Sequence, residues 1–247
     1  MTAPPSPTAA VLIIGNEILS GKTQDANLQF LGLELAKLGI RLEEARVVRD
    51  VPDAIVGAVN ACREKYTYVF TTGGIGPTHD DITAECIALA FGAPLVVDPG
   101  AVERLKRGGR ELNEARLRMA RVPQGAELID NPLSNAPGFK IDNVFVLAGI
   151  PSVARAMFAA AAPLLTQGAP IASASADVHL RESDFAAALD DIQRKNPEVE
   201  IGSYPFNRDG RYGATLVVRG TDPALIDRAL DQIIDAMTAL GGETKRN

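Results

Sequence analysis

In the first 170 residues, short continuous apolar runs alternate with segments in which apolar residues recur every three or four positions. The runs AAVLIIG (9–15) and YTYVFT (66–71) have the length and composition of buried strands. Leu28, Leu31 and Leu35 have the spacing of an amphipathic helix. The pattern predicts strands at 9–15, 41–48, 66–71, 95–97, 127–129 and 144–147, and helices at 25–39, 52–65, 81–91 and 151–165. Such alternation predicts a mostly parallel sheet covered by helices on both faces.

The pattern changes near residue 170. Residues 172–180 alternate polar and apolar, and they precede a predicted helix at 182–195, strands at 199–204 and 213–219, and a helix at 223–240. This order predicts a small α+β domain with antiparallel strands. We therefore divide the chain into a flexible, proline-rich tail (1–7), an α/β domain (8–170) and an α+β domain (171–247).

Composition narrows the class of protein. The chain has 247 residues, 46% of them hydrophobic, and a formal net charge of −6. This balance is that of a globular protein, and the acidic charge argues against a nucleic-acid partner. No apolar run approaches the roughly 20 residues of a membrane span. Two cysteines in predicted helices exclude a disulfide scaffold. We expect a cytoplasmic protein without nucleic-acid or membrane partners.

The sequence TTGGIGPTHDDITAE (71–85) carries the clearest chemical signal. It follows a predicted strand and opens a predicted helix, so its glycines fall where α/β proteins bind ligands. Glycines permit close approach of a ligand, and helix N–H groups suit a phosphate. Asp80 and Asp81 could hold a divalent cation or cap the helix. The alternative is a tight turn with an N-capping aspartate, but the added Pro77, Thr78 and paired aspartates favour a ligand site.

Further polar residues follow other predicted strands. Gly15 and Glu17 leave the first strand, with Asn27 behind them, and this segment is equally consistent with a ligand site or a solvated loop. Asp50 ends the second strand and could contact a ligand or the following helix. The segments NPLSNAPGF (131–139) and AGIPSV (148–153) could close over a ligand or form simple turns.

Residues 103–121 reverse the overall charge, with a local net charge of +4. Such a segment could attract an anionic substrate. It could also be a solvated helix surface with ion pairs one turn apart. Asn113 and Arg116 are the two residues here that we retain as candidate ligand contacts.

Taken together, these motifs resemble the molybdopterin-binding domain of the MoaB/Mog type, in the branch formed by the N-terminal part of CinA, the competence/damage-inducible protein A. The matching segments are GGIGPTHDDIT, GNEILSG with DAN behind it, VVRD, APGF and GIPS, all in order over about residues 8–165. IGSYPF and LVVRG resemble the small domain that follows in that branch. The glycine segment is also similar to that of eukaryotic FAD synthases.

The resemblance implies a three-layer α/β/α, MoaB/Mog-like domain followed by a small α+β domain, with a phosphate-bearing small molecule at the strand ends. It implies a pyrophosphatase that uses Mg²⁺ or Co²⁺ and acts on ADP-ribose, FAD or a related dinucleotide. The alternative is a molybdopterin-binding protein of molybdenum-cofactor metabolism without hydrolase activity. Related domains are often dimers or trimers, so we expect a homo-oligomer.

By matched position and by the patterns above, we assign catalytic roles to Asp81, Asp80 and Asp50, and metal binding to Asp80, Asp81 and Glu17. The candidate ligand-binding residues are Gly15, Glu17, Asn27, Thr72, Gly73, Gly74, Gly76, Pro77, Thr78, Asn113, Arg116, Pro137 and Gly138. Asn16 stands where the family motif usually has Asp, which removes one carboxylate. The chain also ends without the C-terminal amidohydrolase domain of full-length CinA, so we do not expect deamidation of pyridine nucleotides.

Overall fold

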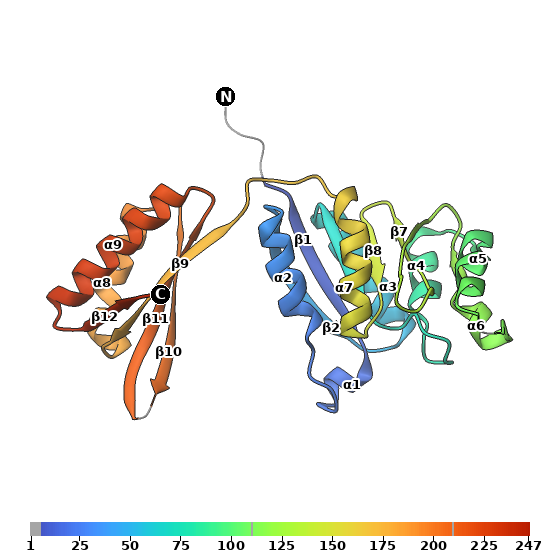
Figure 1. Ribbon diagram of the computed structural model, residues 1–247, viewed down its shortest axis with the longest axis horizontal. Coiled ribbons are helices and arrows are strands. Elements are labelled where there is room, and N and C mark those ends of the chain that lie inside the picture. The colour runs from blue at the N-terminus through green and yellow to red at the C-terminus, as the bar shows by residue number, and fades with distance from the viewer. Residues whose placement is uncertain (1–5, 110, 209) are drawn as a thin grey trace. The chain divides into compact units, whose positions relative to one another are not determined.

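The computed structural model describes residues 6–247 apart from 110 and 209, so most of the predicted tail lies outside the described residues. The chain forms two compact units (Figure 1). The first comprises the described residues up to Gly168 apart from Lys37–Gly39, and the second comprises those three residues and Ala169–Asn247. Among the described residues, no helix is both long and apolar enough to cross a membrane.

The first unit is built on a six-stranded sheet in the order β2-β1-β3-β8-β7-β6. Its strands are β1 (Thr8–Ile14), β2 (Arg41–Val48), β3 (Tyr68–Thr72), β6 (Glu127–Ile129), β7 (Gly138–Ile141) and β8 (Val144–Leu147). The pairs among β2, β1, β3 and β8 are parallel, whereas β7 is antiparallel to both of its neighbours. The predicted, mostly parallel sheet is therefore confirmed. The sequence did not predict β7, part of which we had placed in a loop.

Helices cover both faces of this sheet (Figure 1). On one face lie α2 (Asn27–Lys37) and α7 (Pro151–Ala161), joined by an edge-to-face contact between Phe30 and Phe158 with ring centroids 5.7 Å apart. On the other face, α3 (Pro52–Lys65) and α4 (Thr83–Phe91) bury Cys62 and Cys86. Burial raises the pKa of the Cys86 thiol to about 11, which keeps this core thiol protonated.

The basic segment (residues 103–121) lies mostly between β4 (Leu95–Val97) and β5 (Arg121–Pro123), two strands that pair as a separate antiparallel ribbon. Between these strands in the chain lie α5 (Pro99–Arg107) and α6 (Glu114–Arg118), and α5 contributes Ala101 and Leu105 to a small core with Ala120. The predicted strand at 95–97 exists, but it pairs outside the main sheet. Two short elements complete the unit: α1 (Asn16–Leu19) and the 3₁₀ turn η1 (Ala162–Leu164).

The second unit is an antiparallel sheet with both helices on one face (Figure 1). Its elements are β9 (Ala172–His179), α8 (Glu182–Lys195), β10 (Glu200–Arg208), β11 (Arg211–Gly220), α9 (Pro223–Ala239) and β12 (Glu243–Arg246). The strand order is β10-β11-β9-β12. The predicted antiparallel α+β fold is thus confirmed. The sequence did not predict β12, because its residues ETKR are polar and show no apolar alternation.

Three strand ends of the first unit meet at Gly73, the residue that follows β3. Gly73 has φ +104°, and a Cβ atom placed on it would lie 2.1 Å from the carbonyl oxygen of Ile14. Its N–H donates to the carbonyl oxygen of Leu147 at 3.2 Å. A Cβ on Gly149 would lie 3.3 Å from the Cα of Gly73. Only a residue without a side chain lets the ends of β1, β3 and β8 converge in this way.

We predict that Gly73→Ala lowers the free energy of unfolding by about 2–4 kcal/mol, since the added methyl group collides with backbone and the residue is held at positive φ. The matched control is Gly21→Ala, at φ +72°, with no atom of the described residues within 4 Å of the new Cβ. Gly21→Ala should lower the free energy of unfolding by only about 1–2 kcal/mol, the strain of an alanine held at positive φ. Urea unfolding of both variants measures the difference, and equal losses would contradict the role of the close approach.

Glu44 on β2 links three neighbouring side chains. The Tyr66 hydroxyl donates to its Oε2 at 2.6 Å, Arg46 Nε lies 2.5 Å from Oε1, and Lys65 Nζ lies 3.4 Å from Oε2. These hydrogen bonds, that of Tyr66 first, lower the pKa of Glu44 from 4.5 to about 2. A folded-state pKa below the unfolded value means that the charged carboxylate stabilises the fold above about pH 4.5.

We therefore predict that the stability advantage of the wild type over Glu44→Gln is full at neutral pH and shrinks as the pH falls from 4.5 towards 2. Urea unfolding at a series of pH values measures it. Tyr66→Phe removes the largest contribution and should reduce the pH dependence. A difference between wild type and Glu44→Gln that stays constant over this range would show that the pKa of Glu44 is not lowered by folding.

Candidate functional site

The glycine segment lies at the point where the order of the parallel strands reverses. The chain passes from β1 to β2 on one side, and then to β3 on the other side of β1. The loops that leave β1 and β3 therefore start side by side at the carboxyl edge of the sheet. Open α/β sheets bind their ligands at such a switch point. This is the edge on which the sequence placed Gly15 and the residues from Thr72 to Asp81.

The glycine loop (73–82) is fastened to the first turn of α4 by Thr83. The buried Thr83 hydroxyl donates to the carbonyl oxygen of Gly73 at 2.9 Å, and its N–H donates to that of Gly74 at 3.0 Å. Gly74 has φ +67°, and a Cβ there would lie 2.2 Å from the Thr83 hydroxyl oxygen. Thr83 thus fixes the path of the loop, and α4 begins two residues later than predicted because residues 78–81 form a turn.

Asp81 also shapes the glycine loop. Its Oδ2 accepts a hydrogen bond from the Thr78 N–H at 2.8 Å and another from the Thr78 hydroxyl. A Cβ on Gly76 would lie 2.6 Å from the same oxygen. One oxygen of the predicted catalytic and metal-binding carboxylate is therefore occupied by the loop itself, and the geometry gives Asp81 a positioning role.

Asp80 differs from Asp81 in its exposure. About two thirds of its side chain is exposed, and its Oδ1 lies 4.0 Å from Nδ1 of the exposed His79. Hydrogen bonding, first of all to the Thr78 side chain, lowers the pKa of Asp80. The carboxylate is therefore ionised at neutral pH and accessible to a cation from solvent.

Two acidic side chains likewise shape the loop after β1. Asp50 Oδ2 accepts from the backbone N–H of Asn16 at 2.7 Å and so ties the end of β2 to the start of α1. The Glu17 carboxylate folds back over Gly15, where a Cβ would lie 2.5 Å from its Oε1. Asp50, predicted as catalytic, thus positions this loop. It meets α1 rather than α3, the following helix of the alternative interpretation.

Two predicted ligand residues carry buried oxygens without a hydrogen-bond partner among the described residues: Asn27 through Oδ1 and Thr72 through its hydroxyl. Asn27 is 4% exposed and Thr72 is 1% exposed. The other end of the Asn27 amide donates to the carbonyl oxygen of Gly149 at 2.8 Å, which joins α2 to the GIPS turn. Buried polar atoms without partners are rare, and at a strand-end site they fit a ligand that completes their bonding.

A cavity of about 550 Å³ adjoins the glycine loop. This volume lies in the usual range of small-molecule pockets. Three predicted residues line it, namely Pro77, Asn113 and Arg116. Four more lining residues, Leu133, Ser134, Asn135 and Ala136, belong to the segment 131–139 that could close over a ligand, and the others are Gly108, Glu111 and Met119.

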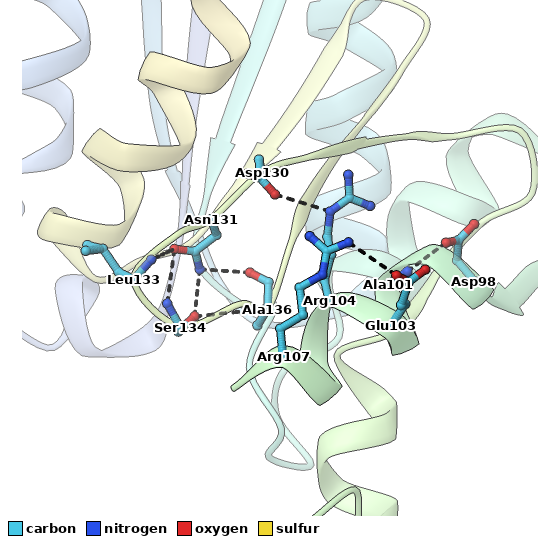
Figure 2. Close-up of polar contacts among 10 residues, drawn as sticks. All are labelled: Asp98, Ala101, Glu103, Arg104, Arg107, Asp130, Asn131, Leu133, Ser134 and Ala136. Carbon is cyan, nitrogen blue, oxygen red and sulfur yellow. Dashed lines mark hydrogen bonds and ion pairs between the residues drawn. The ribbon is translucent and has the colours of Figure 1, made fainter. Parts of the chain in front are cut away.

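One wall of this cavity is the turn at 131–136, which Asn131 organises (Figure 2). The amide nitrogen of Asn131 donates to the Ser134 hydroxyl at 2.6 Å and to the carbonyl oxygen of Ala136 at 2.8 Å. Its amide oxygen accepts from the N–H groups of Leu133 and Ser134. Asn131 is only 3% exposed, so one buried side chain holds the turn together through four hydrogen bonds.

Pro137 and Gly138 follow this wall. Pro137 lines a recess of only about 20 Å³ together with Gly74, Asp81 and Arg118, which is room for about one water-sized group. A Cβ on Gly138 would lie 2.4 Å from the carbonyl oxygen of Val146. The glycine is therefore required by the pairing of β7 with β8, and its contact with a ligand stays a prediction.

The described residues include no group of three or more His, Cys, Asp or Glu side chains placed to hold a metal ion. Glu17, Asp80 and Asp81 therefore do not form a metal centre on their own. The predicted metal site combined Glu17 from the loop after β1 with Asp80 and Asp81 from the glycine loop. The carboxylates of Glu17 and Asp81 are each turned towards their own loop.

Two family models match the chain. Residues 10–167 match the probable molybdopterin-binding domain, and residues 170–241 match the middle domain of FAD synthase. The second match covers most of the second unit, and the FAD synthase middle domain is not an amidohydrolase domain.

Individual relatives agree with these matches. A protein of Aeropyrum pernix is 37% identical over 212 residues, which cover 81% of this chain and 79% of that protein. A CinA-like protein of Gloeobacter violaceus is 37% identical over 163 residues, 62% of this chain but only 38% of the relative. The crystal structure of a CinA protein of unknown function from Thermoplasma acidophilum is 34% identical, with a TM-score of 0.60 over 63% of this chain and 97% of that one. The chain thus belongs to the family of the probable molybdopterin-binding domain and is a homologue of CinA-like proteins.

Proposed function

We propose that the strand-end site binds a phosphate-bearing nucleotide and, with Mg²⁺ or Co²⁺, hydrolyses the pyrophosphate bond of ADP-ribose, FAD or a related dinucleotide. The observation that carries this proposal is the glycine loop, whose backbone Thr83 and Asp81 hold in place beside an exposed, ionised Asp80. The matches to a molybdopterin-binding domain and to a domain of FAD synthase support a ligand of this chemical class.

The loop and the start of α4 supply donors for a phosphate. The N-terminal turn of an α-helix has N–H groups without intrahelical partners, and the helix dipole favours an anion there. Within the described residues, no side chain caps this end of α4. The N–H groups of Gly73 and Thr83 already donate to carbonyl oxygens, so a phosphate would accept hydrogen bonds from other main-chain N–H groups of the loop and of the first turn of α4.

The carboxylates present fit a metal ion that is shared with the ligand's phosphates. Mg²⁺ is commonly bound by one or two carboxylates together with substrate phosphates and water. Asp80 would supply the carboxylate, since it is the exposed acidic group of the loop. When bound, the metal would neutralise phosphoryl charge and activate water. Asp81, Thr78 and Thr83 would keep the loop in the shape that presents Asp80 and the N–H groups.

We predict that Asp80→Asn lowers metal-dependent hydrolysis of ADP-ribose about a hundredfold or more, and leaves metal-free binding of ADP-ribose nearly unchanged. Chromatography of the AMP released and calorimetry measure the two quantities. Asp81→Asn is the matched control, because the asparagine oxygen can still accept from Thr78. Wild-type hydrolysis by Asp80→Asn would refute its role, and an equal loss in a folded Asp81→Asn would show that both carboxylates bind metal.

A molybdopterin-binding protein without hydrolase activity is the second candidate function. It is favoured by the match of residues 10–167 to the probable molybdopterin-binding domain. The phosphate of a pterin would use the same N–H groups of the glycine loop. Saturable binding of molybdopterin, without cleavage of ADP-ribose, FAD or NAD by the wild type in the presence of Mg²⁺ or Co²⁺, would decide for this candidate.

A further inference from the structure

The 550 Å³ cavity is lined by Arg116, which has no carboxylate partner among the described residues. Arg116 lies on α6, and one of its terminal nitrogens donates to the carbonyl oxygen of Leu105 at 3.2 Å. Its Nε is buried and has no hydrogen-bond partner among the residues that the structure describes. No ion pair within that part of the chain includes Arg116, although the acidic residue Glu111 also lines the cavity.

Three other arginines of the basic segment form ion pairs, whereas Arg118, like Arg116, forms none within the described residues. Arg104 Nε lies 3.2 Å from Asp130, and a terminal nitrogen of Arg107 lies 3.3 Å from Glu103; Figure 2 shows both contacts. Arg121 lies 2.9 Å from Glu85. Only the Arg107–Glu103 pair is the helix-surface ion pair one turn apart that the alternative interpretation predicted, because Arg104 and Arg121 pair with acidic residues outside their own elements. A guanidinium that is partly withdrawn from water without a counter-charge is unfavourable by itself, which points to an anion supplied by a ligand.

Other polar groups of the cavity converge on Arg116. A Cβ on Gly108 would lie 3.3 Å from the amide nitrogen of Asn135, 3.4 Å from the carbonyl oxygen of Leu105 and 3.7 Å from a terminal nitrogen of Arg116. Two donor nitrogens therefore lie near the same point, beside the carbonyl oxygen that accepts one hydrogen bond from Arg116. The Asn113 side chain accepts from the Arg116 N–H at 2.9 Å and fixes the start of α6. Asn135, at φ +62°, belongs to the fixed turn organised by Asn131.

The cavity continues from the glycine loop. Pro77 lines it and directly follows Gly76, and Met119 lines both this cavity and the small recess beside Asp81. A ligand whose first phosphate binds at the glycine loop can therefore extend into the cavity. Guanidinium groups bind phosphates through strong, charge-assisted hydrogen bonds.

We propose that this cavity is a subsite for a second anionic group of the ligand, a phosphate monoester separate from the pyrophosphate. Arg116 supplies the positive charge, and Asn135 supplies a further donor. The subsite rests on the proposed function for the placement of the first phosphate. It makes a dinucleotide that carries an additional phosphate a better ligand than the same dinucleotide without one.

The first test observes Arg116 directly. The Nε–H signals of the ¹⁵N-labelled full chain are titrated with inorganic phosphate, and Arg116→Lys and Arg104→Lys assign the two signals of interest. We expect a saturable shift of the Arg116 signal and none of the Arg104 signal, whose Nε is already paired with Asp130. An Arg116 signal that phosphate leaves unchanged would overturn the proposal without requiring any variant to bind ligand.

The second test compares ADP-ribose with ADP-ribose 2′-phosphate by calorimetry without metal. We expect wild type and the control Arg104→Gln to bind the 2′-phosphate form about ten- to a hundredfold more tightly than ADP-ribose, and Arg116→Gln to bind the two forms with equal affinity. A preference that survives in Arg116→Gln, or is missing in the wild type, would refute the subsite. If neither nucleotide binds while phosphate still shifts the Arg116 signal, the proposed function fails and the anion site stands.

Discussion

The close approach of Gly73 to the carbonyl oxygen of Ile14 is the constraint on which the rest of the strand-end site depends. It brings the ends of β1, β3 and β8 together, and Gly149 completes the contact from the third strand. Once the backbone is this close, the glycine loop must turn away towards α4, where Thr83 holds it. Asn27 then ties α2 to the same point through Gly149. The site is therefore a consequence of backbone packing before any of its side chains contributes chemistry.

The acidic residues around this point divide into two kinds. Asp50 and Asp81 each accept a backbone N–H through one oxygen, and the Glu17 carboxylate folds over Gly15. These carboxylates give the loops their shape, and the oxygens that do so are less available to a ligand. Asp80 is exposed, and Arg116 has no carboxylate partner among the described residues. Pro77 lines the cavity with Arg116 and stands three residues before Asp80, so the proposed cation site and the proposed anion site both adjoin the glycine loop.

Much of the fold could be predicted because its elements have local signatures. A continuous apolar run marks the buried strand predicted at 9–15. A proline at its first position marks the helix at 52–65. The elements that sequence reasoning missed lack such a signature. β12 is polar, and it exists only because β9 offers it a free edge. β7 begins at a glycine that reads as part of a loop, and its strand conformation follows from pairing with β6 and β8.

The candidate site also has a part with a local sequence signature and a part without one. The glycine loop is encoded within a dozen consecutive residues, so its position at a strand end could be inferred directly. The cavity depends on Gly108 and Arg116 meeting Asn135, which is 19 or more residues further along the chain, and no local pattern specifies that meeting. Residue type also fails to distinguish a carboxylate that shapes a loop from one that is left exposed to solvent. Asp80 and Asp81 are identical and adjacent, and only the direction in which each side chain leaves the turn separates their roles.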